Sequence, residues 1–462
     1  MHCKKIYNSF IFKIIFNLLN FIRKMKLLII SYYFPPIGGT SVQRTVRFIK
    51  KLSKLGYSIH VFSAKKGKWL IQDDTLKNEL PKSIKIHRKK HLDIPGYFNS
   101  YNFSSSIREK RIKLFNNSCS LKYKFLRKYN GFLKNHILKP DDKIFWARSF
   151  IKYGVKVIKR NNIDIIYATG PPFSNFMLGL WLKNKTKKPF IIDFRDGWTE
   201  YTMKGRINKY DFKLERDIVI NANMVIFNTN WLKNKYKSKY LRILDNKSYL
   251  IRNSFDDKIL SIKPINRRDK KFIISYTGVF SESMNFNKKE RTPYFLFNAL
   301  NNLIEKNKIS ENEIQFQYIG PINNSLSYLV KKYNLYNIVD IIGPKSHNET
   351  LQYQKAADCL FLMIYDRENS DGHIPGKLYE YLATRKPILA TIPNSNECKK
   401  IIEESRSGIV IPVDNIKLIE QGILDIMKKR FIVDKNYDIS KYSAYYQTTS
   451  LINIFDNVFY KH

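Results

Sequence analysis

The sequence predicts an α/β protein made of two doubly wound, Rossmann-like parallel-sheet domains that face a cleft. Three observations support this prediction. The chain has 462 residues, which exceeds the roughly 250–300 residues at which a single hydrophobic core stops growing. Short apolar runs alternate with amphipathic segments from residue 25 onward, as in sheets whose strands are connected by helices. A polar segment at 257–271 interrupts this alternation, which then starts again and indicates a second domain.

Four segments follow from this pattern. Residues 1–24 form a basic, amphipathic extension, the two domains span 25–262 and 263–430, and a helical tail occupies 431–462. The extension is too short and too charged to span a bilayer, but on a helix its apolar face could lie in an anionic membrane surface. The alternative is that the protein starts at Met25 and the preceding residues carry no structure.

The chain is strongly basic, with a formal net charge of +43 from 82 Lys and Arg against 39 Asp and Glu. Such a charge attracts polyanions, among them nucleic acid, acidic polysaccharide and anionic lipid. The basic runs are dispersed, and no recognition helix or RNA-binding aromatic motif accompanies them, so we expect no specific nucleic-acid partner. The four cysteines form no CxxC pair, which argues against a disulfide framework or a zinc site and favours a reducing compartment.

The first domain opens with a strand, a glycine loop, a helix and a second strand. The strands are expected at 26–31 and 58–63 and the helix at 41–55, which is the length that a right-handed parallel crossover requires. Gly38, Gly39 and Thr40 follow the first strand, at the carboxyl edge where doubly wound sheets bind ligands. We therefore expect these three residues in the cleft, with Arg44 reaching in from one turn along the helix.

A region of mixed aromatic and basic residues, 65–143, is predicted as a variable insertion that holds one or two helices. Beyond it, the alternation of strands and helices continues. The expected strands are 164–168, 190–192, 224–228 and 249–251, and the expected helices are one that ends near residue 160, 176–183 and 211–220.

Charged residues follow the strand at 190–192. Asp193, Arg195 and Asp196 stand where a parallel strand ends, which is the expected place of a ligand site. The alternative is a structural ion-pair cluster. A metal site is not predicted, because a single Asp-x-x-Asp without a supporting histidine or carboxylate cluster is weak evidence.

The second domain repeats the alternation and ends in an apolar stretch that predicts a C-terminal helix. Its expected strands are 272–277, 314–319, 339–342, 357–364, 387–391 and 408–412, and its expected helices are 293–306, 325–333, 348–355, 377–385, 396–404 and 416–429.

One loop in this domain has the features of an anion site. The turn at Pro375-Gly376 enters a helix whose first residues include Lys377, at the end where helix stability alone would favour an acidic residue. Backbone N–H groups at a helix N-terminus bind phosphates, and the lysine adds a full positive charge. Glu380 lies one turn further on the same face and could accept hydrogen bonds from ligand hydroxyls. The alternative is a solvent-exposed Lys-Glu pair.

Six short motifs stand in a characteristic order along the chain. They are YFPPIGG at 33–39 with Arg44, TGPPFS at 169–174, DFRDGW at 193–198, IRNSFD at 251–256, YTG at 276–278 and PGKLYEYL at 375–382. Together these motifs resemble the GT-B glycosyltransferases of family 4, and the resemblance extends from residue 25 to about residue 429. It implies a GT-B fold, with a nucleotide-sugar donor on the second domain and an acceptor on the first.

The resemblance also implies roles for the residues of the second domain. Glu380 matches the family glutamate that holds the nucleotide ribose, and Pro375-Gly376-Lys377 falls where the diphosphate binds. Gly278 lies in the loop after the first strand of the donor domain. The family often carries a second glutamate eight residues before the first, where this chain has Gly372, and Asp371 is expected to substitute for it in donor binding.

On the acceptor side, Arg195 stands roughly where many members carry a cleft histidine. The resemblance therefore implies that Arg195, Asp196 and Lys377 are the catalytic residues. The residues expected to line the acceptor side of the cleft are Gly38, Gly39, Thr40, Arg44 and Asp193.

The implied activity is a retaining, metal-independent transfer of sugar from a UDP- or GDP-sugar to a glycan or lipid-linked acceptor, without a cofactor. Cell-surface polysaccharide synthesis is the expected pathway, in the cytoplasm or peripherally on the inner face of the cell membrane. A sugar-nucleotide epimerase of the same fold is the first alternative. A basic protein that binds nucleic acid or membranes is an alternative of a different class.

Overall fold

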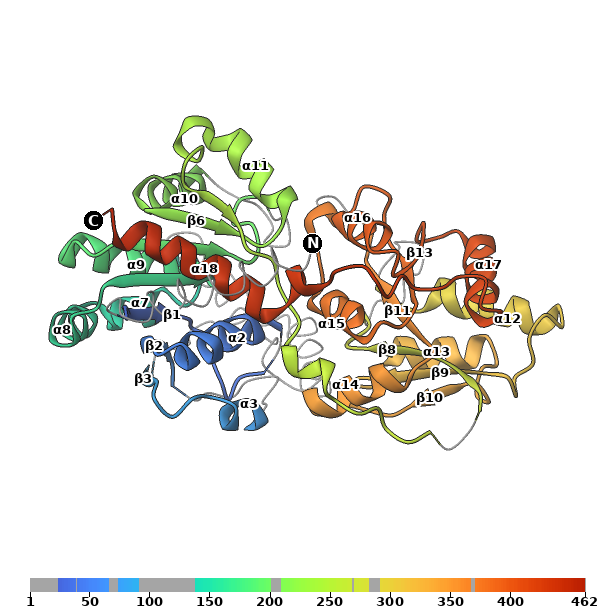
Figure 1. The fold of residues 1–462 in the computed structure, drawn as a ribbon. Helices are drawn as coiled ribbons and strands as arrows, with labels where there is room; N and C mark the ends of the chain where they lie inside the picture. The colour runs from blue at the N-terminus through green and yellow to red at the C-terminus, as the bar shows by residue number, and fades with distance from the viewer. Residues whose placement is uncertain are drawn as a thin grey trace, which may run out of the picture. The chain divides into compact units, whose positions relative to one another are not determined.

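The computed structural model describes residues 24–38, 40–65, 74–90, 138–200, 209–267, 270–281, 291–366 and 370–461, and these form two compact units (Figure 1). Unit 1 contains the chain up to Arg195, Tyr210–Val225 and the residues from Ile452 onward. Unit 2 contains the segment that begins at Asp196 and Ile226–Leu451. The predicted amphipathic extension lies outside the described residues except for Lys24.

A six-stranded parallel sheet with the strand order β10-β9-β8-β11-β12-β13 forms the centre of unit 2. Its strands are β8 (Phe272–Thr277), β9 (Ile314–Ile319), β10 (Val339–Ile341), β11 (Cys359–Met363), β12 (Ile388–Thr391) and β13 (Gly408–Ile411). The helices between and after them are α12 (Tyr294–Glu305), α13 (Asn324–Lys332), α14 (His347–Ala356), α15 (Gly376–Thr384), α16 (Glu397–Glu404) and α17 (Ile416–Met427). The predicted succession of strands and helices is confirmed.

The side chains of the central strand β11 divide between two cores, because successive residues of a strand point to opposite faces. Phe361 and Met363 join a core with α12, α13 and α17, whereas Leu360 and Leu362 join a core with α14, α15 and α16 (Figure 1). All four side chains are buried. A strand covered on both faces reads as a continuous apolar run, which is why the sequence predicted it.

The second sheet has seven strands in the order β3-β2-β1-β4-β5-β6-β7, and the strands β1–β5 pair in parallel. Its strands are β1 (Lys26–Ile30), β2 (Ser58–Ala64), β3 (Lys85–Lys89), β4 (Ile165–Gly170), β5 (Phe190–Phe194), β6 (Met224–Phe227) and β7 (Ser248–Leu250). The helices that alternate with them are α2 (Thr40–Lys54), α3 (Asp74–Asn78), α7 (Ile144–Ser149), α8 (Ile151–Asn161), α9 (Ser174–Thr186), α10 (Lys209–Asn221) and α11 (Asn230–Tyr240). The fold class of two parallel-sheet α/β domains is thus confirmed.

The region predicted as a variable insertion contains an additional strand of this sheet. Residues 85–89 form the edge strand β3, which pairs with β2 in parallel from His60↔Lys85 to Ala64↔Lys89. The basic run KIHRK hid this strand, because an edge strand can keep charged side chains on its open faces. Helix α11 was also not predicted from the sequence, since its charged and polar residues show little apolar periodicity. Residues 91–137 of the predicted insertion lie outside the described residues.

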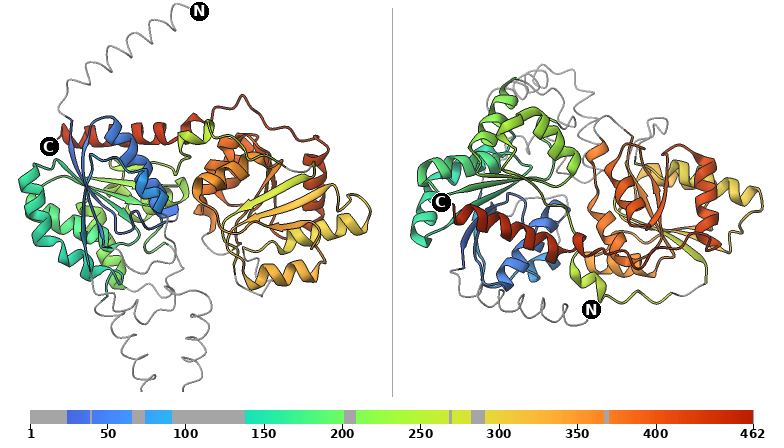
Figure 2. Two further views of the ribbon diagram at one scale, coloured as in Figure 1. Left: turned by 90° about the horizontal axis from the view of Figure 1, so that it is seen from below. Right: turned by 45° about the horizontal axis from the view of Figure 1, so that its top comes forward.

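The predicted C-terminal helix is present as α18 (Ala444–Phe459). Helix α18 is drawn in red near the C-terminus in Figure 2, and its last turns belong to unit 1. The buried Phe455 ring of this helix lies 5.9 Å from the ring of Tyr167 on β4. The predicted domain bounds of 25–262, 263–430 and 431–462 remain predictions. Within the part of the chain that the structure describes, no helix has both the length and the apolar character needed to cross a membrane.

Two histidines couple the edge strand β3 to the rest of its sheet. His60 Nδ1 and His87 Nε2 lie 3.0 Å apart, and His87 Nδ1 lies 2.7 Å from the Tyr153 hydroxyl. Burial, together with the charges of His87, Lys85 and Lys26, lowers the pKa of His60 from 6.5 to about 4. The folded protein therefore holds His60 neutral at a pH where the unfolded chain already binds a proton.

We expect the folded state to lose stability as the pH falls from about 6.5 to about 4. Because the pKa of His60 is lower in the folded state, the contribution of the neutral His60 to the free energy of unfolding is complete above pH 6.5. This contribution decreases as the pH falls, by on the order of 3 kcal/mol once the pH reaches about 4. Urea unfolding at pH 7.5 and pH 4.5 measures this change. The variant His60→Gln should lose less stability over the same interval, and an equal loss in both proteins would contradict the assignment.

Candidate functional site

The candidate site of unit 2 is built on the N-terminus of α15. Pro375 is its N-cap residue in an extended conformation, and no side chain caps the helix there. The first turn also lacks an acidic residue. The sequence therefore starts a helix whose N-terminal amides carry partial positive charge without a neutralising side chain, with Gly376 and Lys377 as its first two residues.

Lys377 turns back from this helix toward the end of β8. Its ammonium group donates to the carbonyl oxygen of Thr277 and lies 3.9 Å from the centroid of the Tyr276 ring. Burial is the main reason that its pKa falls to about 7, the charge of Arg291 lowers it further, and Glu380 opposes the shift. A lysine whose pKa is about 7 is only partly protonated at neutral pH, and it becomes fully charged when an anion binds beside it.

Two further basic side chains lie close to Lys377. Arg291 and Lys377 both lower the pKa of His373, which burial chiefly brings to about 4. The Nε atom of Arg291 is buried and has no hydrogen-bond partner among the described residues. Buried basic groups that repel one another are costly unless an anion compensates them. The cluster of Arg291, His373 and Lys377 is therefore suited to a ligand that carries several negative charges.

Glu380 lies one turn beyond Lys377 on α15. Its Oε1 atom lies 3.0 Å from Nε2 of His347, the first residue of α14, and its side chain is 13% exposed. The capping box of Ser346 and Glu349 sets the start of α14 and so places His347. The imidazole orients the carboxylate and leaves part of its surface accessible to a hydroxyl-bearing ligand.

Gly278 follows β8 in a backbone conformation, φ +128°, that favours glycine. A Cβ atom added there would come within 2.6 Å of Lys377 Nζ. Gly320, which follows β9, packs against the carbonyl oxygen of Gly278 so closely that a Cβ would overlap it. These two glycines let the ends of β8 and β9 approach each other beside Lys377.

Asp371 lines a hollow of the same unit. It lies in the short helix η7 (Ser370–Gly372), and its Oδ1 atom accepts a hydrogen bond of 2.5 Å from the Ser395 hydroxyl. It lines a hollow together with Trp231, whose ring packs so tightly on Gly372 that a Cβ there would overlap the ring. The packing of Trp231 thus explains the glycine at 372.

Arg44 and Asp193 form a buried bidentate ion pair in unit 1. Arg44 Nε donates to Asp193 Oδ2 and its NH2 group donates to Oδ1, both at 2.9 Å, and the two residues are 4% and 0% exposed. Asp193 also accepts from the Tyr167 hydroxyl at 2.6 Å and from Thr169 Oγ1 at 3.0 Å. The structure thus brings two of the predicted acceptor-side residues together in a buried ion pair, and their predicted place in the cleft stays a prediction.

The other predicted residues of the first domain lie near the carboxyl ends of the strands. The guanidinium of Arg195 donates to the Pro171 carbonyl, and its backbone N–H donates to Gly170 O at 2.8 Å. Asp196 follows it and is half-buried, and Gly38 is buried in the loop after β1. Gly39 lies outside the described residues, and so does the side chain of Thr40, the first residue of α2.

Sequence reasoning missed three members of the unit 2 site, namely Arg291, His347 and His373. His347 lies within the S-x-x-E capping box at 346–349, a signal that locates the start of a helix without indicating a site. Arg291 and His373 carry no local pattern, because only the fold brings them to Lys377.

The pKa of Lys377 leads to a prediction for ligand binding. A diphosphate favours the charged lysine, so binding should raise its pKa above about 7 and take up a proton between the two values. Affinity for UDP-glucose should be constant below about pH 7 and weaken as the pH rises, at a limit of about tenfold per pH unit. UDP-glucose is a suitable probe because its diphosphate has no group that titrates near neutrality.

Isothermal titration calorimetry from pH 6 to pH 9, in buffers of different ionisation enthalpy, measures both the affinity and the proton uptake. The variant Lys377→Arg is the matched control, since arginine stays charged throughout this range. The same pH profile in both proteins would show that another group is responsible.

Part of the chain matches a known protein family. Residues 262–445, which include the whole α15 region, match the family model described as "Glycosyl transferases group 1". A comparison with curated protein sequences found no match.

Solved structures similar to this chain share its fold at low sequence identity. A glycosyltransferase from Rickettsia africae is 16% identical with a TM-score of 0.58, and 95% of this chain and 97% of that chain are covered. Anabaena HepE in complex with UDP is 12% identical with a TM-score of 0.60, covering 94% and 100%. A putative UDP-N-acetylglucosamine 2-epimerase from Listeria monocytogenes is 11% identical with a TM-score of 0.57, covering 95% and 98%.

Likeness at such identities shows the fold alone, which is GT-B, whereas the family model covers the domain that carries Lys377 and Glu380. Taken together, the two findings give a GT-B fold and a match of residues 262–445 to the model of the glycosyl transferases group 1 family.

Proposed function

We propose that this chain is a retaining, metal-independent glycosyltransferase of family 4 that transfers a sugar from a UDP- or GDP-sugar to a glycan or lipid-linked acceptor. The observation that carries the proposal is the basic cluster of Arg291, His373 and Lys377 beside the uncapped N-terminus of α15, with Glu380 one turn further along. A nucleoside diphosphate has matching chemistry, since its phosphates suit the cluster and its ribose hydroxyls suit the carboxylate.

The proposed reaction requires the protein to stabilise developing charge and does not require a covalent intermediate with the protein. When the bond between the anomeric carbon and the diphosphate oxygen breaks, positive charge develops on the sugar and negative charge on the leaving diphosphate. The α15 amides, Lys377 and Arg291 stabilise the leaving group. The acceptor hydroxyl attacks from the leaving-group side, which retains the configuration, and its proton passes to a diphosphate oxygen.

The first domain is proposed to bind the acceptor. Arg195 and Asp196, which follow β5, are the proposed catalytic residues there. The proposed pathway is the synthesis of cell-surface polysaccharide, which fits the high positive charge because such acceptors are often acidic or attached to anionic lipid. The proposed location is the cytoplasm or the inner face of the cell membrane.

A thermal-shift screen against UDP-, GDP-, ADP- and dTDP-sugars tests the proposal. A donor at about 100 times its Kd should stabilise the protein by roughly 2.7 kcal/mol. Incubation of the best ligand without an acceptor, followed by analysis of the sugar, separates a transferase from an epimerase, because only the epimerase converts the donor alone. Absence of stabilisation by every nucleotide sugar would contradict both activities.

Replacing Glu380 with glutamine should weaken UDP binding by about 10- to 100-fold, because hydrogen bonds to the ribose lose their charged acceptor. Inorganic diphosphate, which has no ribose, should bind the variant and the native protein equally. Calorimetric titration with both ligands measures the difference. Equal losses for the two ligands would show that Glu380 acts on the phosphates or on the fold.

A further inference from the structure

The hollow lined by Asp371 and Trp231 does not include the residues of the basic cluster around Lys377. It has a volume of about 410 Å³ and is lined by Trp231, Asn234, Asp371, Asn394, Ser395 and Lys399, among others. All of its lining residues belong to the same compact unit. Its size falls within the ~300–1,000 Å³ of typical small-molecule sites.

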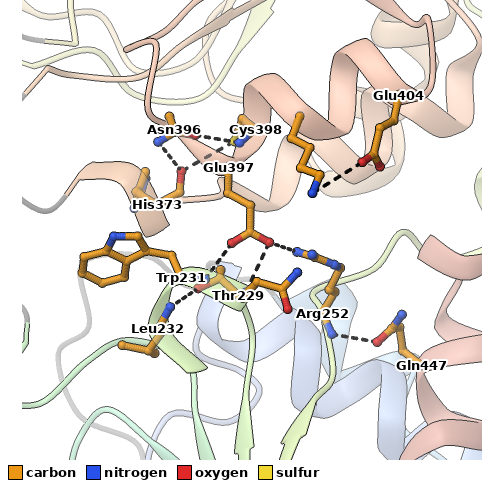
Figure 3. A network of polar contacts seen from close by, with 12 residues as sticks. Thr229, Trp231, Leu232, Arg252, His373, Asn396, Glu397, Cys398, Glu404 and Gln447 are labelled. Carbon is orange, nitrogen blue, oxygen red and sulfur yellow. Dashed lines mark hydrogen bonds and ion pairs between the residues drawn. The ribbon is translucent and has the colours of Figure 1, made fainter. Parts of the chain in front are cut away.

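The aromatic wall of this hollow is held in place from two sides. Glu397 Oε2 accepts the backbone N–H of Trp231 at 3.0 Å, and its carboxylate pairs with Arg252 at 2.5 Å (Figure 3). On the other side, the indole ring packs directly on Gly372. A ring fixed by its backbone and by its neighbour is a preformed surface, which reduces the entropy that a ligand loses on binding.

The remaining lining is rich in groups that recognise hydroxyls. Asp371 and Ser395 are joined by a hydrogen bond of 2.5 Å, and side-chain amides come from Asn234 and Asn394. Amides both donate and accept hydrogen bonds, and so do sugar hydroxyls. A pyranose also presents an apolar C–H face that stacks on an aromatic ring. Trp231 supplies this ring, and the ammonium group of Lys235 lies 5.5 Å from the ring centroid.

The charge of the hollow argues against a phosphate-bearing ligand. The chain carries a net charge of +43, yet this hollow is lined by three carboxylates and two lysines. Glu397 is paired with Arg252, which leaves Asp371 and Glu403 to balance Lys399 and Lys400, so the lining has no excess of positive charge. One of these lysines, Lys399, is 3.9 Å from Glu403 on its own helix. A neutral, polyhydroxylated ligand suits such a lining better than a polyanion does.

We propose that this hollow of unit 2 binds a further sugar residue of the acceptor, in addition to the part that the first domain is proposed to hold, with the sugar stacked on Trp231 and hydrogen-bonded by Asp371. The assignment of that sugar to an acceptor rests on the proposed function. It gives Asp371 a role in carbohydrate binding outside the diphosphate cluster, and it explains why a glycine stands at 372, where a side chain would displace the Trp231 ring.

Nuclear magnetic resonance of the full chain labelled with ¹⁵N at its five tryptophans tests this proposal. The probes are methyl glycosides of glucose, galactose, mannose and N-acetylglucosamine, with UDP titrated in parallel. The variant Trp231→Phe identifies the indole resonance of Trp231. We expect at least one glycoside to shift that resonance in the native protein. Trp231→Ala and Trp231→Phe lack the resonance, so their binding is followed on the signals of the glycoside itself, with about tenfold weaker binding expected in Trp231→Ala and a smaller loss in Trp231→Phe.

Tyr328→Ala, which removes a partly exposed aromatic ring on α13, is the matched control and should bind the glycoside normally. UDP should bind all of these variants with unchanged affinity. If no glycoside shifts the Trp231 resonance, or if Trp231→Ala binds it unchanged, the sugar site is overturned even when UDP binds. If the glycoside binds at Trp231 and UDP does not bind, the sugar site stands and the proposed function fails.

Discussion

Replacing Lys377 with alanine should lower the rate of sugar transfer about 100- to 1,000-fold while the protein stays folded. The ammonium group lies at the uncapped N-terminus of α15, where the leaving diphosphate would gain charge, and loss of one such group typically costs this much. The folded state should keep its stability, because two effects of the substitution oppose each other. It removes the contacts of Lys377 with the Thr277 carbonyl and the Tyr276 ring, and it also removes the repulsion between Lys377 and Arg291. Release of UDP from the donor found in the screen measures the rate.

Lys332→Ala is the matched control for this variant. Lys332 also places its ammonium group over tyrosine rings, 5.0 Å from Tyr294 and 5.3 Å from Tyr333, but it stands at the end of α13. Its removal should leave the rate unchanged. Full activity of Lys377→Ala would remove the donor site from the N-terminus of α15.

Replacing Asp193 with alanine should destabilise the protein by about 3–5 kcal/mol. The substitution leaves Arg44 buried without its bidentate partner, and it also removes the acceptor for the hydroxyls of Tyr167 and Thr169. Chemical denaturation followed by circular dichroism measures the change. The size of the effect reflects the uncompensated charge more than the strength of the pair itself.

The double variant Arg44→Leu/Asp193→Leu separates these two contributions. Because it removes both charges, it should be less destabilised than Asp193→Ala, although both lack the ion pair. A role of Asp193 confined to acceptor binding would instead leave the stability of the single variant close to that of the native protein.

Features with a strong local pattern could be predicted from the sequence. The succession of strands and helices in unit 2 was predicted closely, since buried parallel strands and amphipathic helices leave strong periodic signals. Lys377 and Glu380 stood out because a glycine turn, a helix start and a misplaced charge are local features. The edge strand β3 and helix α11 escaped prediction because polar and charged residues mask their periods.

Partners that are distant in the sequence could not be read in the same way. Arg44 and Asp193 are 149 residues apart, and both have the residue type and the position of cleft residues. Only the packing of α2 beside the ends of β4 and β5 shows that each satisfies the other. The position of Trp231 over Gly372 likewise depends on a helix that carries no sequence signal of its own.

The amino-acid sequence alone was enough to establish the two-sheet α/β architecture and to predict an anion site at the N-terminus of α15, because both depend on short-range patterns of burial and charge. The tertiary structure decided which charged side chains meet each other. That choice depends on the electrostatic balance of buried groups brought together from distant segments, as with Arg291, His373 and Lys377 on one side and Arg44 with Asp193 on the other.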